Sequence, residues 1–333
     1  MAHHRVRNDP ERTPHTYWTR KAAGALATLW LASVAVFLLL RLAPGDPVSA
    51  ALGAEADQEQ RDRLADSLGV DRPMPVQYLG WLHGLLTGDP GSSFHYREPV
   101  TRLIGQSVGS TVQLALAAGL LMLVLGLLLG VALASERRGR LARVLDPPAT
   151  ALLALPVYVT AVLFVFVFAV LLRLLPAGGE RDLFAAPDLA VQYLALPAVA
   201  LALPGSAVLA RLLATELRRT RQEEFVLTAV AKGASPRRVL ARHVVPNSLA
   251  PFFVEFGLHL GELLGGAVVA EQLFARHGLG QLLLDAINQR DYPVAQTLIM
   301  LAVAVAVLVQ LGSELLVGRL DPRIARAGTG EDR

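Results

Sequence analysis

Long apolar stretches alternate with short polar ones along this chain of 333 residues. An α-helix needs about 20 apolar residues to cross a hydrocarbon core about 30 Å thick. Five uncharged stretches reach that length, and a sixth is apolar except for three ionisable side chains. The six stretches are residues 22–40, 107–135, 147–172, 189–210, 244–270 and 292–313. The pattern therefore predicts an all-α polytopic membrane protein with six transmembrane helices.

Composition agrees with this pattern, because 53% of the residues are hydrophobic and only 18% are charged. A soluble domain of ordinary composition carries about 25% charged residues. The first apolar stretch follows Arg20 and Lys21, as the core of a signal peptide would. It is longer than the usual core of about 7–15 residues, and no small-x-small cleavage site closes it. We therefore expect a retained first transmembrane helix over residues 22–42.

Basic residues gather on one side of the predicted membrane topology. The ends of the chain, the segment after the second span and the segment 211–242 hold 21 of the 31 Lys and Arg residues. The positive-inside rule makes this side cytoplasmic. Residues 1–21 and 319–333 are therefore predicted to be cytoplasmic tails. We expect no nucleic-acid binding, because the sequence has no basic soluble domain with interleaved aromatic residues.

The composition also excludes several kinds of chemistry. The chain has no cysteine, which rules out disulfides, thiolate metal sites and thiol catalysis. Lys21 and Lys232 are its only lysines, and neither lies in a phosphate-binding G-x-x-x-x-G-K-[ST] loop. We expect no cofactor on this chain. ATP-driven transport would need an ATPase on another polypeptide.

A polar and basic segment, Glu223 to Pro251, lies between two apolar stretches. Residues 224–232 contain no helix breaker, and Gly233 is expected to end that helix because glycine adopts the left-handed conformation cheaply. The Ser235 hydroxyl can cap the next helix, and Pro236 suits its first turn, where no N–H is needed. The sequence therefore predicts two short helices that meet at a corner.

The second of these helices is expected to be amphipathic and to run into apolar sequence after Pro246. Its basic side carries Arg237, Arg238, Arg242 and His243, and its apolar side carries Val239, Leu240, Val244 and Val245.

This segment resembles the EAA loop of ABC-transporter permeases, in which a glycine and a later Leu-Pro punctuate a cytoplasmic helix that docks on an ATPase. Gly233 falls on that glycine and Val245-Pro246 on the Leu-Pro, whereas Leu227 replaces a charged residue. The resemblance implies an ATPase-coupling loop over residues 217–246, and the alternative is an ordinary solvated loop. The residues that it assigns to coupling are Thr228, Ala229, Lys232, Gly233, Ser235, Pro236 and Pro246.

Further motifs resemble the B-type permease subunits of dipeptide, oligopeptide and nickel importers. In the predicted external segment 43–106 they are PGDP (44–47), LGVDRP (68–73), QY with Trp81, GDPGSS (88–93) and PV (99–100). A later passage runs from Glu271 and Phe274 through Gly278 and Gly280 to Asp291-Tyr292-Pro293, and the chain closes on LDPR (320–323). The external segment is either a structured cap or a surface that receives a solute-binding protein.

The resemblance, which covers about residues 20 to 325, implies the type I ABC importer permease fold, with five transmembrane helices in a core over residues 107–318. It also implies a transport subunit rather than an enzyme, located in the bacterial cytoplasmic membrane. The implied partners are a second homologous permease subunit, two cytoplasmic ATPase subunits, an extracytoplasmic solute-binding protein and membrane lipid.

Three ionisable residues lie inside the predicted fifth span. Glu255, His259 and Glu262 follow at steps of four and three, so they fall within about 60° of one another on one helix face. Facing lipid would cost a few kcal/mol each, so we expect them to face a cavity or a partner. His259 and Glu262 could together form part of a metal site, bind a proton or bind a cationic chelate. The alternatives are a mutual His–Glu hydrogen bond or a contact with a second permease.

The same passage, His259-Leu260-Gly261-Glu262-Leu263-Leu264-Gly265-Gly266, resembles the HxGELxGG passage of nickel-importer permeases. It favours an importer of nickel or another metal chelate, with Glu255, His259 and Glu262 as the candidate substrate pathway. The alternative keeps the machinery and changes the cargo to dipeptides or oligopeptides. A remote alternative is an intramembrane metalloenzyme, which lacks the HExxH motif.

Overall fold

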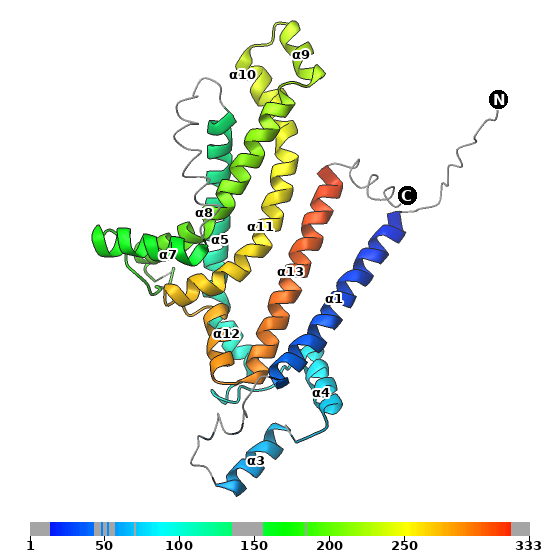
Figure 1. Ribbon diagram of the computed structural model, residues 1–333, viewed down its shortest axis with the longest axis vertical. Coiled ribbons are helices and arrows are strands. Elements are labelled where there is room, and N and C mark those ends of the chain that lie inside the picture. Colours follow the sequence, from blue (N-terminus) through cyan, green and yellow to red (C-terminus); the bar gives the residue numbers. More distant parts are fainter. Residues whose placement is uncertain are drawn as a thin grey trace, which may run out of the picture. The chain divides into compact units, whose positions relative to one another are not determined.

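A computed structural model describes residues 14–42, 48, 52, 57–69, 71–134, 156–183 and 185–320 of the chain (Figure 1). The described residues are mostly helical, and the isolated bridge between Ser92 and Pro99 is their one extended pairing. The chain divides into two compact units. The first comprises residues 1–100 and 289–307, and the second comprises residues 101–288 and 308–333.

The first unit contains α1, α3, α4 and the beginning of α13. These helices are α1 (Pro14–Leu42), α3 (Gln58–Leu68), α4 (Met74–Thr87) and α13 (Tyr292–Leu320), which continues into the second unit. The second unit contains α5 (Val100–Ala134), α7 (Val157–Phe164), the π-helix η2 (Val165–Leu171), α8 (Pro187–Thr220), α9 (Glu224–Ala231), α10 (Pro236–Val239), the π-helix η3 (Leu240–Val244), α11 (Val245–Leu273) and α12 (Leu279–Asn288).

Four described helices are long and apolar enough to cross a membrane. They are Thr19–Leu42, Val100–Ala134, Pro187–Thr220 and Tyr292–Gly312, at four of the predicted spans. A fifth forms if the pair Pro236–Leu263 and Gly265–Leu273, bent by 49°, is one span. The predicted span 147–172 is described only from residue 156, where it forms the shorter apolar helix Val157–Leu171. Six spans therefore stay a prediction, and residues 147–155 lie outside the described part.

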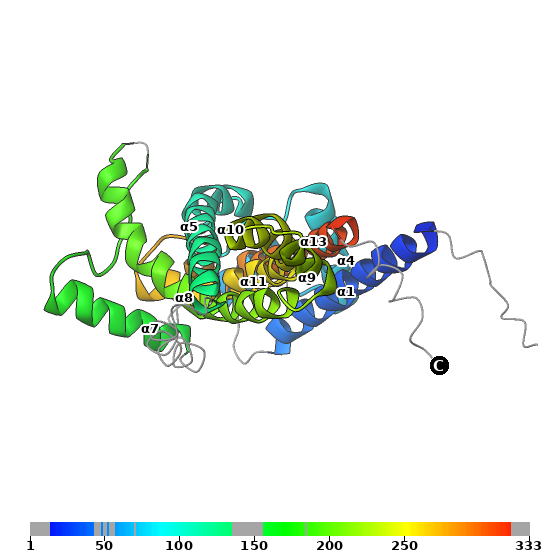
Figure 2. The same ribbon diagram turned by 90° about the horizontal axis from the view of Figure 1, so that it is seen from above.

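The core of the second unit forms where α8 and α11 pack along each other, with α7 against both (Figures 1 and 2). Leu209 and Leu213 of α8 and Phe252 of α11 are fully buried there. A Cβ added at Gly126 of α5 would lie 2.9 Å from Leu209 Cβ, and one at Gly130 would lie 2.8 Å from Leu213 Cβ. Small residues at these positions let α5 approach α8 closely, as is common between membrane helices.

Candidate functional site

The corner predicted after α8 is present in the structure (Figure 1). Helix α9 ends at Ala231, and Gly233 adopts a left-handed conformation with φ of 80°. The Gly233 N–H donates to Val230 O at 2.9 Å, and the Ala234 N–H donates to Ala229 O at 3.2 Å. No atom would meet a Cβ at Gly233 within 4 Å, so backbone conformation rather than space calls for glycine. The prediction for Gly233 is confirmed.

Helix α10 begins at Pro236, as the sequence predicts, but its cap differs from the prediction. Ser235 occupies the cap position with extended backbone, yet its hydroxyl makes no capping hydrogen bond. The Ser235 side chain is exposed, so water can satisfy the first N–H groups of α10 in its place. The prediction of a hydroxyl cap at Ser235 was wrong, whereas the helix start at Pro236 was right.

The chain passes from α10 into α11 without a break, through the π-helix η3. Pro246 lacks an N–H, and its ring would crowd the carbonyl four residues earlier in a regular α-helix. The wider turn of η3, directly before Pro246, accommodates this ring. Side chains also bond its carbonyls, since Asn247 Nδ2 donates to His243 O at 2.6 Å and Ser248 Oγ lies 2.9 Å from Val244 O.

The predicted two-sided character of this helix is confirmed. Val239 and Val244 are buried, whereas the basic side chains on the other side are exposed or half-buried. The exposed ones are Arg237, Arg238 and Arg242, and His243 is half-buried. The apolar side therefore anchors the corner to the rest of the second unit.

Helix α9 has an exposed apolar surface. Phe225, Leu227 and Val230, which we call the α9 apolar surface, are 44%, 58% and 55% exposed and are spread around the helix, while Val226 is buried. Thr228 and Lys232 are also exposed, and Ala229 is half-buried. The Thr228 hydroxyl donates to Glu224 O at 2.8 Å within the helix. A group of exposed apolar side chains with a polar rim is typical of a surface that binds another protein.

The three ionisable residues of α11 lie together, as predicted. His259 Nδ1 is 2.6 Å from Glu262 Oε2, and His259 Nε2 is 3.4 Å from Glu255 Oε1. The first distance is a hydrogen bond, whereas the Nε2 atom is buried and has no hydrogen-bond partner. The imidazole is 14% exposed and the Glu262 carboxylate 73% exposed. The structure thus has the mutual His–Glu hydrogen bond that the sequence left open.

The geometry around His259 offers little for a resident metal ion. Within the described ranges, no group of three or more His, Cys, Asp and Glu side chains is placed to hold one. On its other side, His259 faces α8, where a Cβ at Gly205 would lie 3.9 Å from the imidazole Cγ. His259 and Glu262 would therefore supply two ligands at most, and a cargo or another chain would have to supply the others.

Glu271 organises the C-terminal end of α11, a role that the sequence did not reveal. The buried carboxylate accepts hydrogen bonds from Thr111 Oγ1 at 2.5 Å, from the Gly280 N–H at 2.7 Å and from the Gln281 N–H at 3.2 Å. A Cβ at Gly278 would overlap this carboxylate. The Glu271, Gly278 and Gly280 positions of the motif therefore form one tertiary contact, which joins α5, α11 and the start of α12.

A second buried group follows Glu271 in the turn before α12. Arg276 Nη2 lies 3.4 Å from Ser110 O and 3.7 Å from Glu180 Oε2. Glu180 also accepts a hydrogen bond from Ser110 Oγ at 2.6 Å and lies 3.2 Å from His277 Nδ1. Burial lowers the pKa of Arg276 from its usual value, and the carboxylates of Glu180 and Glu271 oppose that shift. This turn is thereby tied to α5 and to the loop before α8.

Asp291 plays the corresponding part in the first unit. Its fully buried carboxylate accepts hydrogen bonds from Ser93 Oγ, from the Phe94 N–H at 3.1 Å and from the His95 N–H at 3.3 Å. The Ser93 hydroxyl in turn accepts from the Tyr96 N–H at 2.8 Å. Two motifs almost 200 residues apart, GDPGSS and DYP, are therefore partners in one polar cluster.

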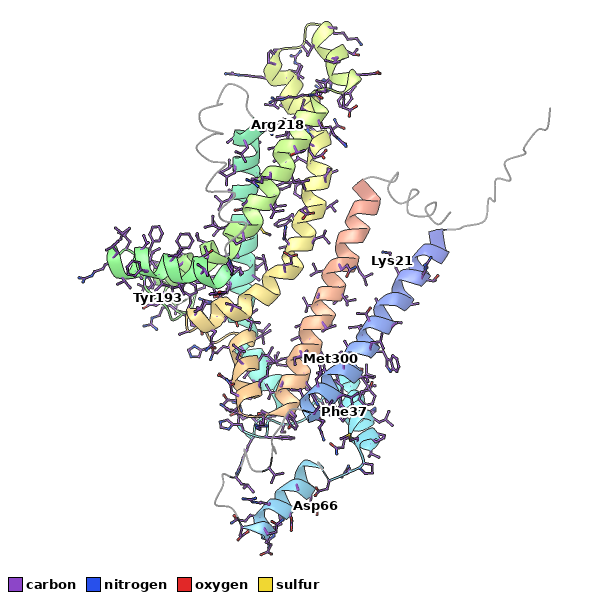
Figure 3. The ribbon with its side chains drawn as sticks, in the orientation of Figure 1. Lys21, Phe37, Asp66, Tyr193, Arg218 and Met300 are labelled. Carbon is purple, nitrogen blue, oxygen red and sulfur yellow. The ribbon has the colours of Figure 1, made fainter. Side chains whose placement is uncertain are left out.

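The QY and Trp81 motif packs α4 against the end of α1 (Figure 3). The Phe37 ring lies 5.4 Å from that of Tyr78 and 6.2 Å from that of Trp81. The Tyr78 and Ser33 hydroxyls are 2.8 Å apart, and Arg41 donates to the Gln77 side chain. These contacts hold α4 against the end of α1, and both predicted roles of the external segment stay predictions. The PGDP motif lies outside the described residues.

Two family models match the sequence. "Binding-protein-dependent transport system inner membrane component" matches residues 122–326, and its N-terminal companion model matches residues 15–115. The chain belongs to this family. It is a permease subunit of an ABC importer, a multi-pass protein of the bacterial inner membrane and not an enzyme. The family description implies a solute-binding protein and an ATPase as partners of the permease.

Curated relatives align with nearly the whole permease. "Probable peptide ABC transporter permease protein y4tP" of Sinorhizobium fredii is 32% identical, and the alignment covers 92% of this chain and 98% of the relative. "Di/tripeptide transport system permease protein DppB" of Pseudomonas aeruginosa is 33% identical, and the alignment covers 93% of this chain and 98% of the relative. "Glutathione transport system permease protein GsiC" of Pectobacterium atrosepticum is 33% identical, and the alignment covers 92% of this chain and 98% of the relative.

A solved structure shares the fold of the permease. The methionine ABC transporter MetNI, in an inward-facing crystal form, gives a TM-score of 0.55 at 19% identity and covers 66% of this chain and 97% of that chain. At this identity the likeness speaks for the fold alone. The predicted type I ABC importer permease fold is confirmed.

Proposed function

We propose that this permease subunit moves peptides across the inner membrane, rather than nickel or another metal chelate. The observation that carries the proposal is the set of relatives named as peptide, di/tripeptide and glutathione permeases, each aligned over at least 92% of this chain. The nickel hypothesis rests on the passage around His259 and Glu262. That passage supplies only two ligands for a metal ion, and they are already hydrogen-bonded to each other. The names of the relatives are therefore stronger support for a peptide cargo than this passage is for nickel.

The loop 217–246 is the proposed ATPase contact. Its α9 apolar surface fits an apolar groove on an ATPase subunit, and Lys232 and Thr228 at its edge add polar contacts. Gly233 and Pro236 set the angle of the corner, and Ala229 packs at its base. Under this proposal the loop and both termini are cytoplasmic, in agreement with the basic residues on that side. A homologous permease and two ATPase subunits complete the proposed assembly.

Glu255, His259 and Glu262 form the proposed lining of the cargo pathway. Glu262 is largely exposed although it lies within a membrane-spanning helix, and a carboxylate in contact with lipid is unfavourable by a few kcal/mol. A water-filled pathway removes this cost. Two carboxyl groups beside one imidazole offer more acceptors than donors, which suits the ammonium group of a peptide.

The cognate solute-binding protein provides a direct test of the cargo. The purified binding protein would be titrated in parallel with a tripeptide such as trialanine and with Ni²⁺, by calorimetry, and its copurifying ligand would be identified by mass spectrometry. We expect tripeptide binding and a copurifying peptide. Tight Ni²⁺ binding without any peptide binding would overturn the proposal and restore the nickel hypothesis.

A further inference from the structure

Two buried hydroxyl groups join the end of α8 to the beginning of α11. Thr220 is the last residue of α8 and Ser248 lies in the first turn of α11. Their Oγ1 and Oγ atoms are 3.0 Å apart, and both residues are almost completely buried. Because α8 enters the loop 217–246 and α11 leaves it, this hydrogen bond closes the base of the loop.

The α11 side of this base departs from regular α-helical geometry. The π-helix η3 and Pro246 directly precede Ser248, and a π-helical turn next to a proline lacks part of the regular hydrogen-bond ladder. The Ser248 hydroxyl is also within hydrogen-bond distance of Val244 O, the last carbonyl of η3. Ser248 therefore lies where the widened turn meets the regular helix, and can hold both to α8.

The α8 side of the base is anchored by two arginines. Arg218, labelled in Figure 3, lies near the end of α8. Its Nη2 donates to Leu133 O at 2.7 Å, and Arg221 Nη1 donates to Ala134 O at 3.2 Å. These carbonyls belong to the last two described residues of α5. The end of α8 is thus attached to α5. The hydrogen bond between Thr220 and Ser248 therefore links α8, which is held to α5, directly to the start of α11 beside the π-helix η3.

We propose that Thr220 and Ser248 are positioning residues that make the ends of α8 and α11 move as one body when the loop moves. Without their hydrogen bond, a displacement of α9 would be absorbed in η3 and would reach α11 only in part. With it, the displacement reaches both helices. The inference rests on the proposed ATPase contact of the loop, but not on the identity of the cargo.

The first test replaces the hydroxyl while keeping the shape of the side chain. In the assembled complex, the stimulation of ATP hydrolysis by the loaded binding protein is expressed as a ratio to the basal rate. We expect Thr220→Val to lower this ratio roughly fivefold, the scale of one neutral hydrogen bond. Thr220→Ser, which keeps the hydroxyl, should restore it. Thr297→Val is the matched control, because the Thr297 hydroxyl is buried and, among the described residues, bonds only Pro293 O in its own helix.

A variant that no longer binds the ATPase can be distinguished from one that binds it but no longer transmits the motion of the loop to α8 and α11. The ATPase content of each purified complex is measured beside the ratio, and the Leu227→Asp variant serves as reference. If Leu227→Asp keeps a full complement of ATPase, the proposed docking surface fails. If Thr220→Val keeps the wild-type ratio, the role of the hydroxyl pair fails instead.

A reversible cross-link provides the second test. The chain contains no cysteine, so the Thr220→Cys, Ser248→Cys double variant introduces a single pair, and Thr220→Cys alone is its control. We expect a low ratio for the reduced pair and recovery of the wild-type ratio after disulfide formation, because the covalent bond replaces the hydrogen bond. A disulfide that abolishes stimulation would show that the two helix ends must separate, and would overturn the proposal.

Discussion

Thr111 Oγ1 and Glu271 Oε1 lie 2.5 Å apart, although 160 residues of sequence separate them. Thr111 is in α5 and Glu271 near the end of α11, and the same hydroxyl oxygen accepts a hydrogen bond from the Leu279 N–H at 2.8 Å. A buried carboxylate and a buried hydroxyl thereby organise the entry into α12. This contact gives a physical reason for the glycines that follow Glu271.

The first prediction concerns Gly278, where a Cβ would overlap the Glu271 carboxylate. Gly278→Ala should force the carboxylate away from its backbone donors and destabilise the permease by about 1–3 kcal/mol, as overpacking does. The measurement is thermal unfolding of the purified chain in detergent. Gly105→Ala is the control, because no atom lies within 4 Å of a Cβ at Gly105, and it should leave the unfolding temperature unchanged or raise it. Equal unfolding temperatures for the two variants would contradict the assignment.

The second prediction concerns Asp291. Asp291→Asn keeps one acceptor oxygen but replaces the other by an NH₂ group, so the side chain can no longer accept from both the Phe94 and the His95 N–H groups. We expect a loss of about 1–3 kcal/mol and faster tryptic cleavage after Arg97, in the segment that these bonds hold. Asp285→Asn is the matched control, since within the described part of the chain Asp285 bonds only the Gln281 side chain in its own helix. Cleavage at Arg97 as slow as in the wild type would show that the cluster does not hold this segment.

The third prediction concerns the α9 apolar surface. Leu227→Asp places a charge in the proposed interface and should reduce the amount of ATPase that copurifies with the permease at least tenfold, because an unpaired buried charge costs several kcal/mol. Leu86→Asp is the matched control, as Leu86 is an exposed leucine of α4. It should leave the ATPase content unchanged. If both variants retained ATPase equally, the docking surface would lie elsewhere.

The fourth prediction separates the two cargoes at the α11 face. Glu262→Gln removes the charge but keeps an oxygen beside His259. It should lower peptide uptake several-fold if the carboxylate attracts the peptide ammonium group. Glu216→Gln, which alters a carboxylate paired with Arg219 in α8, is the control. The double variant His259→Ala, Glu262→Gln tests the nickel hypothesis, which would fail if uptake of nickel and its chelates stayed unchanged.

Local features were predictable from the sequence because their causes are local. Gly233 follows a run without helix breakers, and Pro236 can begin a helix, so the corner could be located before the structure was known. The spacing of Glu255, His259 and Glu262 likewise placed them on one helix face. The missing cap at Ser235 depends on exposure, which a single sequence does not fix.

Tertiary partners were not predictable in the same way. The sequence contained the motifs around Ser93, Glu271 and Asp291 but gave no sign that Ser93 bonds Asp291 or that Thr111 bonds Glu271. Each pair is separated by at least 160 residues, and one sequence carries no record of such contacts. The π-helix before Pro246 was also missed, because proline normally predicts a helix end, whereas here the helix widens and continues.

The measurement closest to the central claim is uptake of a radiolabelled tripeptide into proteoliposomes that contain the permease complex, with the loaded binding protein outside and ATP inside. Under the proposed function, we expect uptake that requires ATP and the binding protein, and that is lost in the Leu227→Asp variant. Accumulation of Ni²⁺ but not of tripeptide under the same conditions, or tripeptide uptake without ATP, would contradict it.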